Sequence, residues 1–489
     1  MIKIKFLTLG LLTSLLLPPF FILPLGFVIF PYFHKLIQEV NRINSFLLHF
    51  VCGFLYGLGF FTIFLIWIRN PFYIDQATEN YAIISFLLIF ILSIIFGVFF
   101  IIFKITRKLN SQLFLIPLIF ILFEILIANL AYGFPWLTFS LIFSNNFFGS
   151  MLIYLFGTHL AGFIIICIFL IPTLFIEKNS SLFFSRSLSF LIISLFILLF
   201  LFYSFLNLNT ESQKSKKINV DLLQMNFSVS QNNILSKDEK YNQIKEAIKS
   251  SEAELIIFGE NNFPYVLNNL DEISLQNYIK DHQTLIIGAT RKDNNNYYNS
   301  LLVIKKNHNQ YFDKKILVPF GEFIPFRNYI TFMEAIAGTV DFKAGFVERN
   351  LAITNELSFI PVICYEIIFF WRLLNNNNLN TNLIINITND AWFGNLVGPY
   401  QHFYITKMRA SEFNKPIIRV SNNGISGIIN HDGKILKSTK LNQYTKINYI
   451  LEVKNKMYNF LNFHKIYNYI FLIIFFCILI ISLIKKYEK

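Results

Sequence analysis

The sequence predicts an α-helical membrane bundle that carries one large α/β domain near its C-terminal end. Of the 489 residues, 54% are hydrophobic and only 15% are charged, whereas soluble domains average roughly 25% charged residues. Apolar runs fill most of residues 1–206, and one more run lies at 466–484. Between them, residues 215–455 are rich in Lys, Asp, Glu and Asn and contain short strand-like runs. These three observations indicate membrane spans on both sides of a polar domain.

The N-terminal part is predicted to contain seven spans, and 466–484 is the eighth. A helix needs about 20 apolar residues to cross a bilayer. The first two runs are shorter than this and are separated by Pro18-Pro19. We expect a hairpin of two tilted helices there; one re-entrant element is the alternative, and no small-residue cleavage site follows that would favour a signal peptide. The seven predicted spans are 6–17, 20–33, 46–68, 81–103, 113–132, 150–175 and 186–206.

Basic residues in the short loops predict the orientation of these spans. Loops that face the cytoplasm carry an excess of Lys and Arg. With eight spans, all the basic residues of the short loops lie on the cytoplasmic side: Lys3, Lys5, Lys35, Arg42, Lys104, Arg107, Lys108, Lys178, Arg186 and the C-terminal lysines. The polar domain then lies on the other side, outside the cytoplasm. Because the net charge of +13 is distributed in this way, it does not indicate nucleic-acid binding.

The polar part of the chain is predicted to be one α/β domain of about 240 residues. Its strand-like runs include INVDLLQ, ELIIFG, TLIIGAT, LLVIK, FIPVICY, LIINIT and PIIRVS, and helix-like segments lie at 237–250 and 270–281. Several runs are continuously apolar, which is typical of strands buried on both faces. Cys364 is the only cysteine in this domain, so an internal disulfide is excluded there, and no CxxC pair supports a zinc knuckle or a dithiol site.

Three stretches of this domain carry reactive side chains. The candidates are Glu260, Lys314, Glu322, Cys364, Tyr365 and Glu366. Several follow strand-like runs, and active sites of α/β sheets gather at the carboxyl ends of strands. A carboxylate could take the proton of a thiol, and an ammonium could stabilise an oxyanion. Taken singly, each residue also has a structural explanation: a small buried thiol, a partner of a helix N-terminus or a surface charge.

Together these stretches resemble the carbon–nitrogen hydrolase (nitrilase) superfamily, whose members have a Glu–Lys–Cys triad in that chain order. The blocks LVPFGEFIP and ICYEI carry the resemblance, and NDAWFG (389–394), Gln401-His402 and RVSNNGIS (419–426) continue it. The membrane half contains GFLYGLGFFTIFLIWI (53–68) and YGFPWL (132–137). With these segments, nearly the whole chain resembles the apolipoprotein N-acyltransferase family.

The resemblance implies a nitrilase-like αββα sandwich inserted between the last two spans of a bacterial inner-membrane protein, on the periplasmic side. It implies Cys364 as nucleophile, Glu260 as general base and Lys314 as the oxyanion-stabilising group, with Glu322, Tyr365 and Glu366 in support. The acyl donor would be a membrane glycerophospholipid and the acceptor a diacylglyceryl-modified apolipoprotein. No metal, organic cofactor or nucleic acid is implied, and a monomer is the default.

Two departures from the family pattern and two buried polar residues stand out. Phe258-Gly259-Glu260 replaces the usual Trp-Pro-Glu, and Asn233 stands about where a Trp is expected. Glu124 lies inside the fifth predicted span, where it is either functional or a buried contact between helices. His159, in the sixth span, is predicted to be structural.

Two other functions remain open at this stage. In a membrane-tethered amidase or nitrilase, water rather than an amine would resolve the thioester. A non-enzymatic scaffold or transporter with a degenerate domain is the second alternative, although the intact order of the three residues disfavours it.

Overall fold

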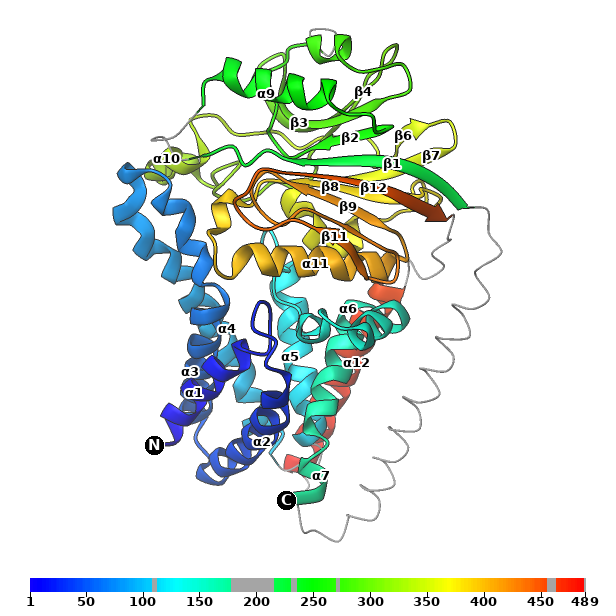
Figure 1. The fold of residues 1–489 in the computed structure, drawn as a ribbon. Coiled ribbons are helices and arrows are strands. Elements are labelled where there is room, and N and C mark those ends of the chain that lie inside the picture. Colours follow the sequence, from blue (N-terminus) through cyan, green and yellow to red (C-terminus); the bar gives the residue numbers. More distant parts are fainter. Residues whose placement is uncertain (108–111, 177–214, 230–234, 270–272, 455–462, 488–489) are drawn as a thin grey trace. The chain divides into compact units, whose positions relative to one another are not determined.

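The computed structural model describes residues 1–107, 112–176, 215–229, 235–269, 273–454 and 463–487 (Figure 1). The chain divides into two compact units. The first comprises Met1–Trp67, Ile83–Ser212 and Asn462–Lys489, and the second comprises Ile68–Ala82 and Gln213–Leu461. The predicted span at 186–206 and residue Asn233 lie outside the described residues.

The described part of the first unit is helical. Its helices are α1 (Ile2–Ser14), α2 (Gly26–Ile43), α3 (Phe46–Phe64), α4 (Ser85–Ile105), α5 (Gln112–Asn129), α6 (Phe147–Leu170), α7 (Thr173–Ile176) and α12 (Phe463–Tyr487), with 3-10 turns at Leu23–Leu25 and Phe139–Phe143. Within the described residues, three helical stretches are long and apolar enough to cross a membrane: Phe46–Phe64, Gln76–Ile105 and Phe147–Phe175. Leu113–Asn129 and Asn468–Ile481 are shorter apolar helices.

The second helix differs from its predicted bounds. It was expected at 20–33, but α2 begins at Gly26 and ends at Ile43. Proline cannot donate a backbone hydrogen bond and disfavours the helical conformation of the residue before it. Pro18, Pro19 and Pro24 therefore keep the chain in turns until Gly26. The helix ends where Asn44 adopts a left-handed conformation with φ of 57°, a common way to stop a helix.

Small residues and buried polar pairs join the helices of the first unit. A Cβ on Gly10 of α1 would lie 2.0 Å from the Tyr56 carbonyl oxygen of α3, so only glycine permits this close approach. The Tyr56 hydroxyl donates to Thr13 Oγ1 at 2.9 Å. Glu124 on α5 accepts a hydrogen bond from the Phe139 amide at 2.9 Å and contacts His159 Nδ1 at 2.6 Å. Glu124 and His159 thus connect α5, α6 and the turn that follows the YGFPWL segment.

The second unit is a sandwich of two six-stranded sheets. One sheet has the order β12-β1-β2-β3-β4-β5 and the other β11-β10-β9-β8-β7-β6. The strands are β1 (Ser215–Gln224), β2 (Leu255–Phe258), β3 (Thr284–Asp293), β4 (Asn296–Ile304), β5 (Gln310–Asp313), β6 (Leu351–Thr354), β7 (Leu357–Ile363), β8 (Leu383–Thr388), β9 (Ile417–Ser421), β10 (Gly427–Ile429), β11 (Ile435–Ser438) and β12 (Thr445–Lys454). Each sheet contains three parallel strands, β1-β2-β3 and β7-β8-β9, flanked by antiparallel ones.

Helices cover the outer faces of the sandwich. Figure 1 shows α9 (Lys237–Lys249) on the outer side of the first sheet and α11 (Gly398–Phe413) on the outer side of the second. Every residue of β2 and β8 is buried, as expected for strands covered on both faces. The predicted αββα arrangement is therefore present, and it brings the carboxyl ends of the parallel strands of each sheet to one edge.

Candidate active site

Three of the predicted residues come together at the ends of strands from both sheets. Glu260 follows β2 by two residues, Lys314 directly follows β5, and Cys364 directly follows β7. All three side chains are buried. Lys314 Nζ lies 3.6 Å from Glu260 Oε1, and the Cys364 thiol interacts with the Glu260 carboxylate. A carboxylate, an ammonium and a thiol therefore share one buried site.

Two further polar residues hold the carboxylate and the ammonium in place. Glu322 Oε1 accepts a hydrogen bond from Lys314 Nζ at 2.8 Å. Asn299, on β4, donates from Nδ2 to Glu260 Oε1 and to Glu322 Oε1, both at 2.7 Å. Lys314 and Asn299 thus lie between the same two carboxylates, and the charge of Lys314 offsets the repulsion between them.

The register of Lys314 is set by the residue before it. Asp313 forms a buried ion pair with Arg291, in which Arg291 Nη2 lies 2.7 Å from Asp313 Oδ2. The Lys314 amide donates to the Asn299 carbonyl oxygen at 2.8 Å. Backbone and side-chain contacts on both sides therefore fix the direction in which Lys314 leaves the sheet.

Cys364 has a strained backbone. Its φ is +51°, a left-handed conformation that is uncommon for a residue with a Cβ. Such strain costs on the order of 1–3 kcal/mol and concentrates at functional sites. The sharp turn from β7 into the 3-10 turn Cys364–Ile368 points the thiol toward Glu260 and Thr388, with both of which it interacts.

The pKa values in this site favour a protonated thiol and a protonated lysine at rest. Burial, with the nearby Glu260 charge, raises the pKa of Cys364 well above its usual range. Although burial favours the neutral amine, the carboxylates of Glu322 and Glu260 raise the pKa of Lys314. Burial raises the pKa of Glu260, and Lys314 opposes that shift. A carboxylate with a raised pKa is a stronger proton acceptor, so the arrangement suits transfer of the thiol proton to Glu260.

Glu366 is a positioning group rather than a member of the reacting cluster. Its carboxylate accepts hydrogen bonds from the Lys315 amide at 2.8 Å and the Ile363 amide at 2.9 Å, and Arg349 Nη2 donates to it at 2.6 Å. Burial opposes ionisation, but Arg349 holds the pKa of Glu366 below its usual range. One buried carboxylate therefore joins the residue that follows Lys314 to the residue that precedes Cys364. Tyr365 is buried and packs edge-on against Phe369, with ring centroids 5.2 Å apart.

The structure adds a buried charged network behind Cys364. His402 Nε2 lies 3.3 Å from the Cys364 carbonyl oxygen, and His402 Nδ1 lies 2.8 Å from Asp390 Oδ1. Arg419 Nη2 lies 2.7 Å from Asp390 Oδ2. These three residues lie in the motifs NDAWFG, QH and RVSNNGIS. The sequence alone did not indicate a role for them, because their contacts join residues far apart in the chain.

The glycine that replaces the usual proline before Glu260 has a local explanation. The Gly259 amide donates to Asn262 Oδ1 at 2.9 Å, and proline has no N–H to donate. A Cβ on Gly259 would also lie 2.8 Å from the Asn422 amide nitrogen. The chain around Glu260 is thus adapted to glycine at this position.

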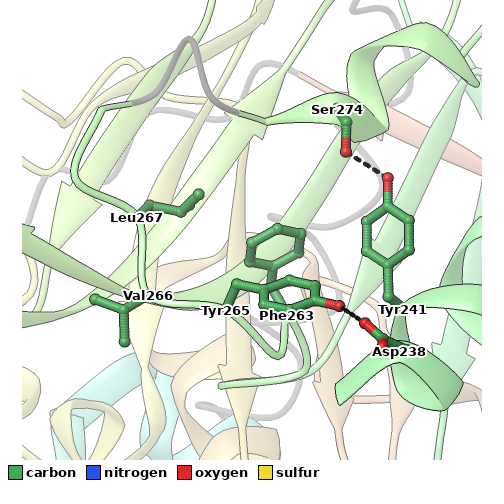
Figure 2. Close-up of a pocket in the computed structure, with 7 residues that line it drawn as sticks. All are labelled: Asp238, Tyr241, Phe263, Tyr265, Val266, Leu267 and Ser274. Atoms are coloured by element: carbon green, nitrogen blue, oxygen red, sulfur yellow. Dashed lines mark hydrogen bonds between the residues drawn. The ribbon is translucent and has the colours of Figure 1, made fainter.

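A surface pocket lies beside the loop that follows Glu260. Figure 2 shows its lining residues: Asp238, Tyr241, Phe263, Tyr265, Val266, Leu267 and Ser274. Its volume is about 390 Å³. Its polar groups pair with each other, Tyr265 with Asp238 and Tyr241 with Ser274, and none of the triad residues lines it. Among the described residues, no group of three or more His, Cys, Asp or Glu side chains could hold a metal ion.

Comparisons with known proteins agree across both halves of the chain. The family described as apolipoprotein N-acyltransferase N-terminal domain matches residues 9–171, and the carbon–nitrogen hydrolase family matches residues 222–450. A protein of Rickettsia prowazekii named apolipoprotein N-acyltransferase is 31% identical over 470 residues, which cover 92% of this chain and 91% of that protein. One of the same name from Wigglesworthia glossinidia brevipalpis is 31% identical over 440 residues, covering 84% and 83%.

Among solved structures, Nit3 of Saccharomyces cerevisiae, a member of the nitrilase superfamily, matches 49% of this chain and 90% of its own with 16% identity and a TM-score of 0.37. The two family matches and the near full-length relatives establish the classification. This chain belongs to the apolipoprotein N-acyltransferase family.

Proposed function

We propose that this protein transfers an acyl chain from a membrane glycerophospholipid to the N-terminal S-diacylglyceryl cysteine of apolipoproteins, through a thioester on Cys364. The observation that carries the proposal is the buried cluster of Glu260, Lys314 and Cys364 in a chain whose sequence has apolar helices before and after the sandwich. Both substrates are anchored in a bilayer. Extracting them would cost about 0.8 kcal/mol for each acyl methylene, and a membrane-held catalyst avoids that cost.

The first half-reaction forms the thioester. Glu260 takes the proton of the Cys364 thiol as the sulfur attacks the ester carbonyl carbon. Lys314 stabilises the negative charge that develops on the carbonyl oxygen. The tetrahedral intermediate collapses, the carbon–oxygen bond to the glycerol breaks, and the departing alkoxide takes the proton from Glu260. A lysophospholipid leaves, and the acyl chain stays on sulfur.

The second half-reaction passes the acyl chain to nitrogen. The α-amine of the lipoprotein attacks the thioester carbonyl, Glu260 takes a proton from the amine, and the sulfur of Cys364 leaves and is reprotonated. Covalent storage of the acyl chain lets two bulky lipids use one site in turn. Glu322 supports this chemistry by accepting from Lys314, and Glu366 supports it by holding the backbone just after Lys314 and just before Cys364. Tyr365 directly follows the nucleophile in the chain and is a third supporting residue of the proposed site.

The membrane arrangement belongs to the same proposal. We infer eight spans, with residues 1–206 carrying seven and 466–484 the last, in the inner membrane of a bacterium. The catalytic domain, residues 215–455, then faces the periplasm, where the lipoprotein acceptor would be presented.

Mass spectrometry of the intact protein tests the proposed function. Detergent-solubilised protein incubated with a phospholipid should gain the mass of one acyl chain, which hydroxylamine removes because it cleaves thioesters. Cys364→Ala should abolish the adduct. Cys477→Ser is the matched control, since Cys477 is an exposed thiol on α12, and it should retain the adduct.

The fate of the adduct separates this function from hydrolysis. Transfer of the acyl chain to a diacylglyceryl-cysteine peptide would support the two-step acyltransferase. An adduct that only water discharges would make the protein a hydrolase. Folded wild-type protein that gains no acyl mass from any phospholipid would overturn the proposal.

A further inference from the structure

His402 is buried directly behind the nucleophile. Its side chain has no exposed surface, and its Nε2 lies 3.3 Å from the Cys364 carbonyl oxygen. That carbonyl belongs to a residue with φ of +51°. The direction of a carbonyl follows from the backbone angles of its residue, so a group that holds the carbonyl also holds the direction of the thiol.

The imidazole is itself fixed from several sides. Asp390 Oδ1 lies 2.8 Å from His402 Nδ1, and Asp390 also accepts from the Thr388 hydroxyl at 3.1 Å. Arg419 Nη2 contacts Asp390 Oδ2 at 2.7 Å and lies 3.1 Å from His402 Nδ1. The Phe393 ring packs edge-on against the imidazole at a centroid distance of 5.4 Å. A ring held in this way presents Nε2 to Cys364 in one orientation.

The contacts of His402 are not needed for the proton transfer or the oxyanion stabilisation of the proposed reaction. Glu260 and Lys314 act on the thiol and on the substrate, whereas His402 contacts the backbone carbonyl of Cys364. Without a partner, the Cys364 carbonyl would be free to relax toward an ordinary extended or helical conformation, and the thiol would turn away from Glu260. A displacement of about 1 Å at a reacting group can cost 100-fold in rate.

We propose that His402 is a positioning residue in its Nε2–H tautomer: Nδ1 accepts from Arg419 Nη2, which Asp390 holds in place, and Nε2 donates to the Cys364 carbonyl. This contact keeps the nucleophile in its strained, reactive conformation. The inference rests on the proposed function, since it concerns the rate at which Cys364 is acylated. It assigns His402 no contact with substrate and no proton transfer to the reacting atoms.

Substitution of His402 by Gln or by Asn tests the contacts of the two ring nitrogens one at a time. The amide of Gln reaches about as far as Nε2, so His402→Gln can still donate to the Cys364 carbonyl. The amide of Asn reaches about as far as Nδ1, so His402→Asn can contact Asp390 but not Cys364. The measurement is the single-turnover rate of Cys364 acylation by a phospholipid, together with the apparent affinity for the phospholipid and the melting temperature of each variant.

His402→Asn should acylate about 100-fold more slowly than the wild type, with unchanged apparent affinity for the phospholipid. His402→Gln should stay within about tenfold of the wild-type rate. Gln283→Leu is the matched control for the loss of a buried hydrogen-bonding side chain: Gln283 donates to the carbonyl oxygens of Ser251 and Ala253 at 2.9 and 3.0 Å, before the start of β3. It should lower the melting temperature and leave the acylation rate of the folded protein unchanged.

Several outcomes would overturn the inference. Folded His402→Asn that acylates at the wild-type rate would show that the Cys364 carbonyl needs no such partner. Equal losses in the Asn and Gln variants would show that no hydrogen bond at Nε2 is involved. If His402→Asn does not fold, a 100-fold loss of the acylation rate in folded His402→Gln would also show that no hydrogen bond at Nε2 is involved. If the wild-type protein itself forms no acyl adduct, the proposed function is contradicted. Failure of the inference on His402 would instead appear only in the variants.

Discussion

At the scale of single residues, the site depends on how two carboxylates share one cation. Glu260 and Glu322 both face Lys314, and Asn299 donates to both from the same nitrogen. The second atom of this amide, Asn299 Oδ1, is buried and has no hydrogen-bond partner. A flipped amide would direct that oxygen at two carboxylates, which is electrostatically worse. The unsatisfied oxygen is therefore the cost of placing a donor between Glu260 and Glu322.

This arrangement predicts the pH dependence of acylation. Glu260 must be ionised to accept the thiol proton, so the rate should fall as the pH drops through the pKa of Glu260, which burial raises above its usual value. The Asn299 hydrogen bond lowers that pKa because it stabilises the charged form. Removing it in Asn299→Ala should raise the pKa further and move the acidic limb of the rate profile to higher pH.

The measurement is the single-turnover acylation rate from acidic to neutral pH. Asn448→Ala is the control, because Asn448 also donates to a carboxylate of the same sheet, Asp221, at 2.8 Å but lies on β12. Its profile should match that of the wild type. An acidic limb that stays in place or moves to lower pH in Asn299→Ala would contradict the assignment of Glu260 as the base.

At the scale of elements, the sequence was informative where a pattern is local. Short strand-like runs, several of them continuously apolar, predicted the strands β1, β2, β3, β4, β7, β8 and β9, because a strand buried on both faces shows this in its own sequence. The Glu–Lys–Cys order likewise pointed to three residues that the fold brings together. The contacts of Asn299, Asp390, His402 and Arg419 with the site were missed, since each depends on a partner supplied by a distant part of the chain. The start of α2 was wrong because composition alone did not show how far the prolines delay the helix.

The segment Ile68–Ala82 was also missed as a separate element. It lies between α3 and α4 in the chain, yet it groups with the sandwich. Asn70 donates from Nδ2 to the Phe393 carbonyl oxygen at 2.8 Å. Phe393 and Gly394 close the NDAWFG turn, whose Asp390 orients His402. A short segment between two predicted spans thus supports the turn behind the nucleophile.

Gly394 allows a direct test of this support. It has φ of 68° and ψ of −153°, a region open almost only to glycine, and a Cβ there would lie 2.2 Å from Asn70 Nδ2. Gly338→Ala is the matched control, since Gly338 has φ of 79° and ψ of 169° but a Cβ there would meet no atom within 4 Å. Gly394→Ala should destabilise the protein by about 1–3 kcal/mol more than Gly338→Ala, the usual cost of overpacking.

Thermal unfolding of both variants in detergent measures this difference. Adding Asn70→Ala to Gly394→Ala should recover part of the loss, because it removes the clashing side chain. Equal melting temperatures for Gly394→Ala and Gly338→Ala would mean that backbone strain alone matters and that Asn70 does not hold the turn.

At the scale of the whole molecule, the chain combines two units that are stabilised in different solvents. The helical unit contains glycine contacts and a few buried polar pairs, such as Glu124 with His159, which suit packing in lipid where apolar side chains gain little from leaving the solvent. The sandwich contains charged networks, such as Asp390 with Arg419, closed off by apolar strands. The proposed thioester chemistry on lipid substrates requires the sandwich to lie on the periplasmic side of the membrane.

Cysteine labelling tests that orientation. In a Cys477→Ser background, Lys237→Cys at the start of α9 should react with a membrane-impermeant maleimide in intact spheroplasts, because the sandwich is expected on the periplasmic side. Ile43→Cys, at a 57% exposed position at the end of α2, should react only after the membrane is permeabilised, because Lys35 and Arg42 predict that this loop faces the cytoplasm. The reverse pattern would place Cys364 in the cytoplasm. Labelling of both positions in intact spheroplasts would show that the first two predicted spans do not form a hairpin. A hairpin crosses the membrane twice and returns Ile43 to the cytoplasm, whereas a single crossing would leave it outside.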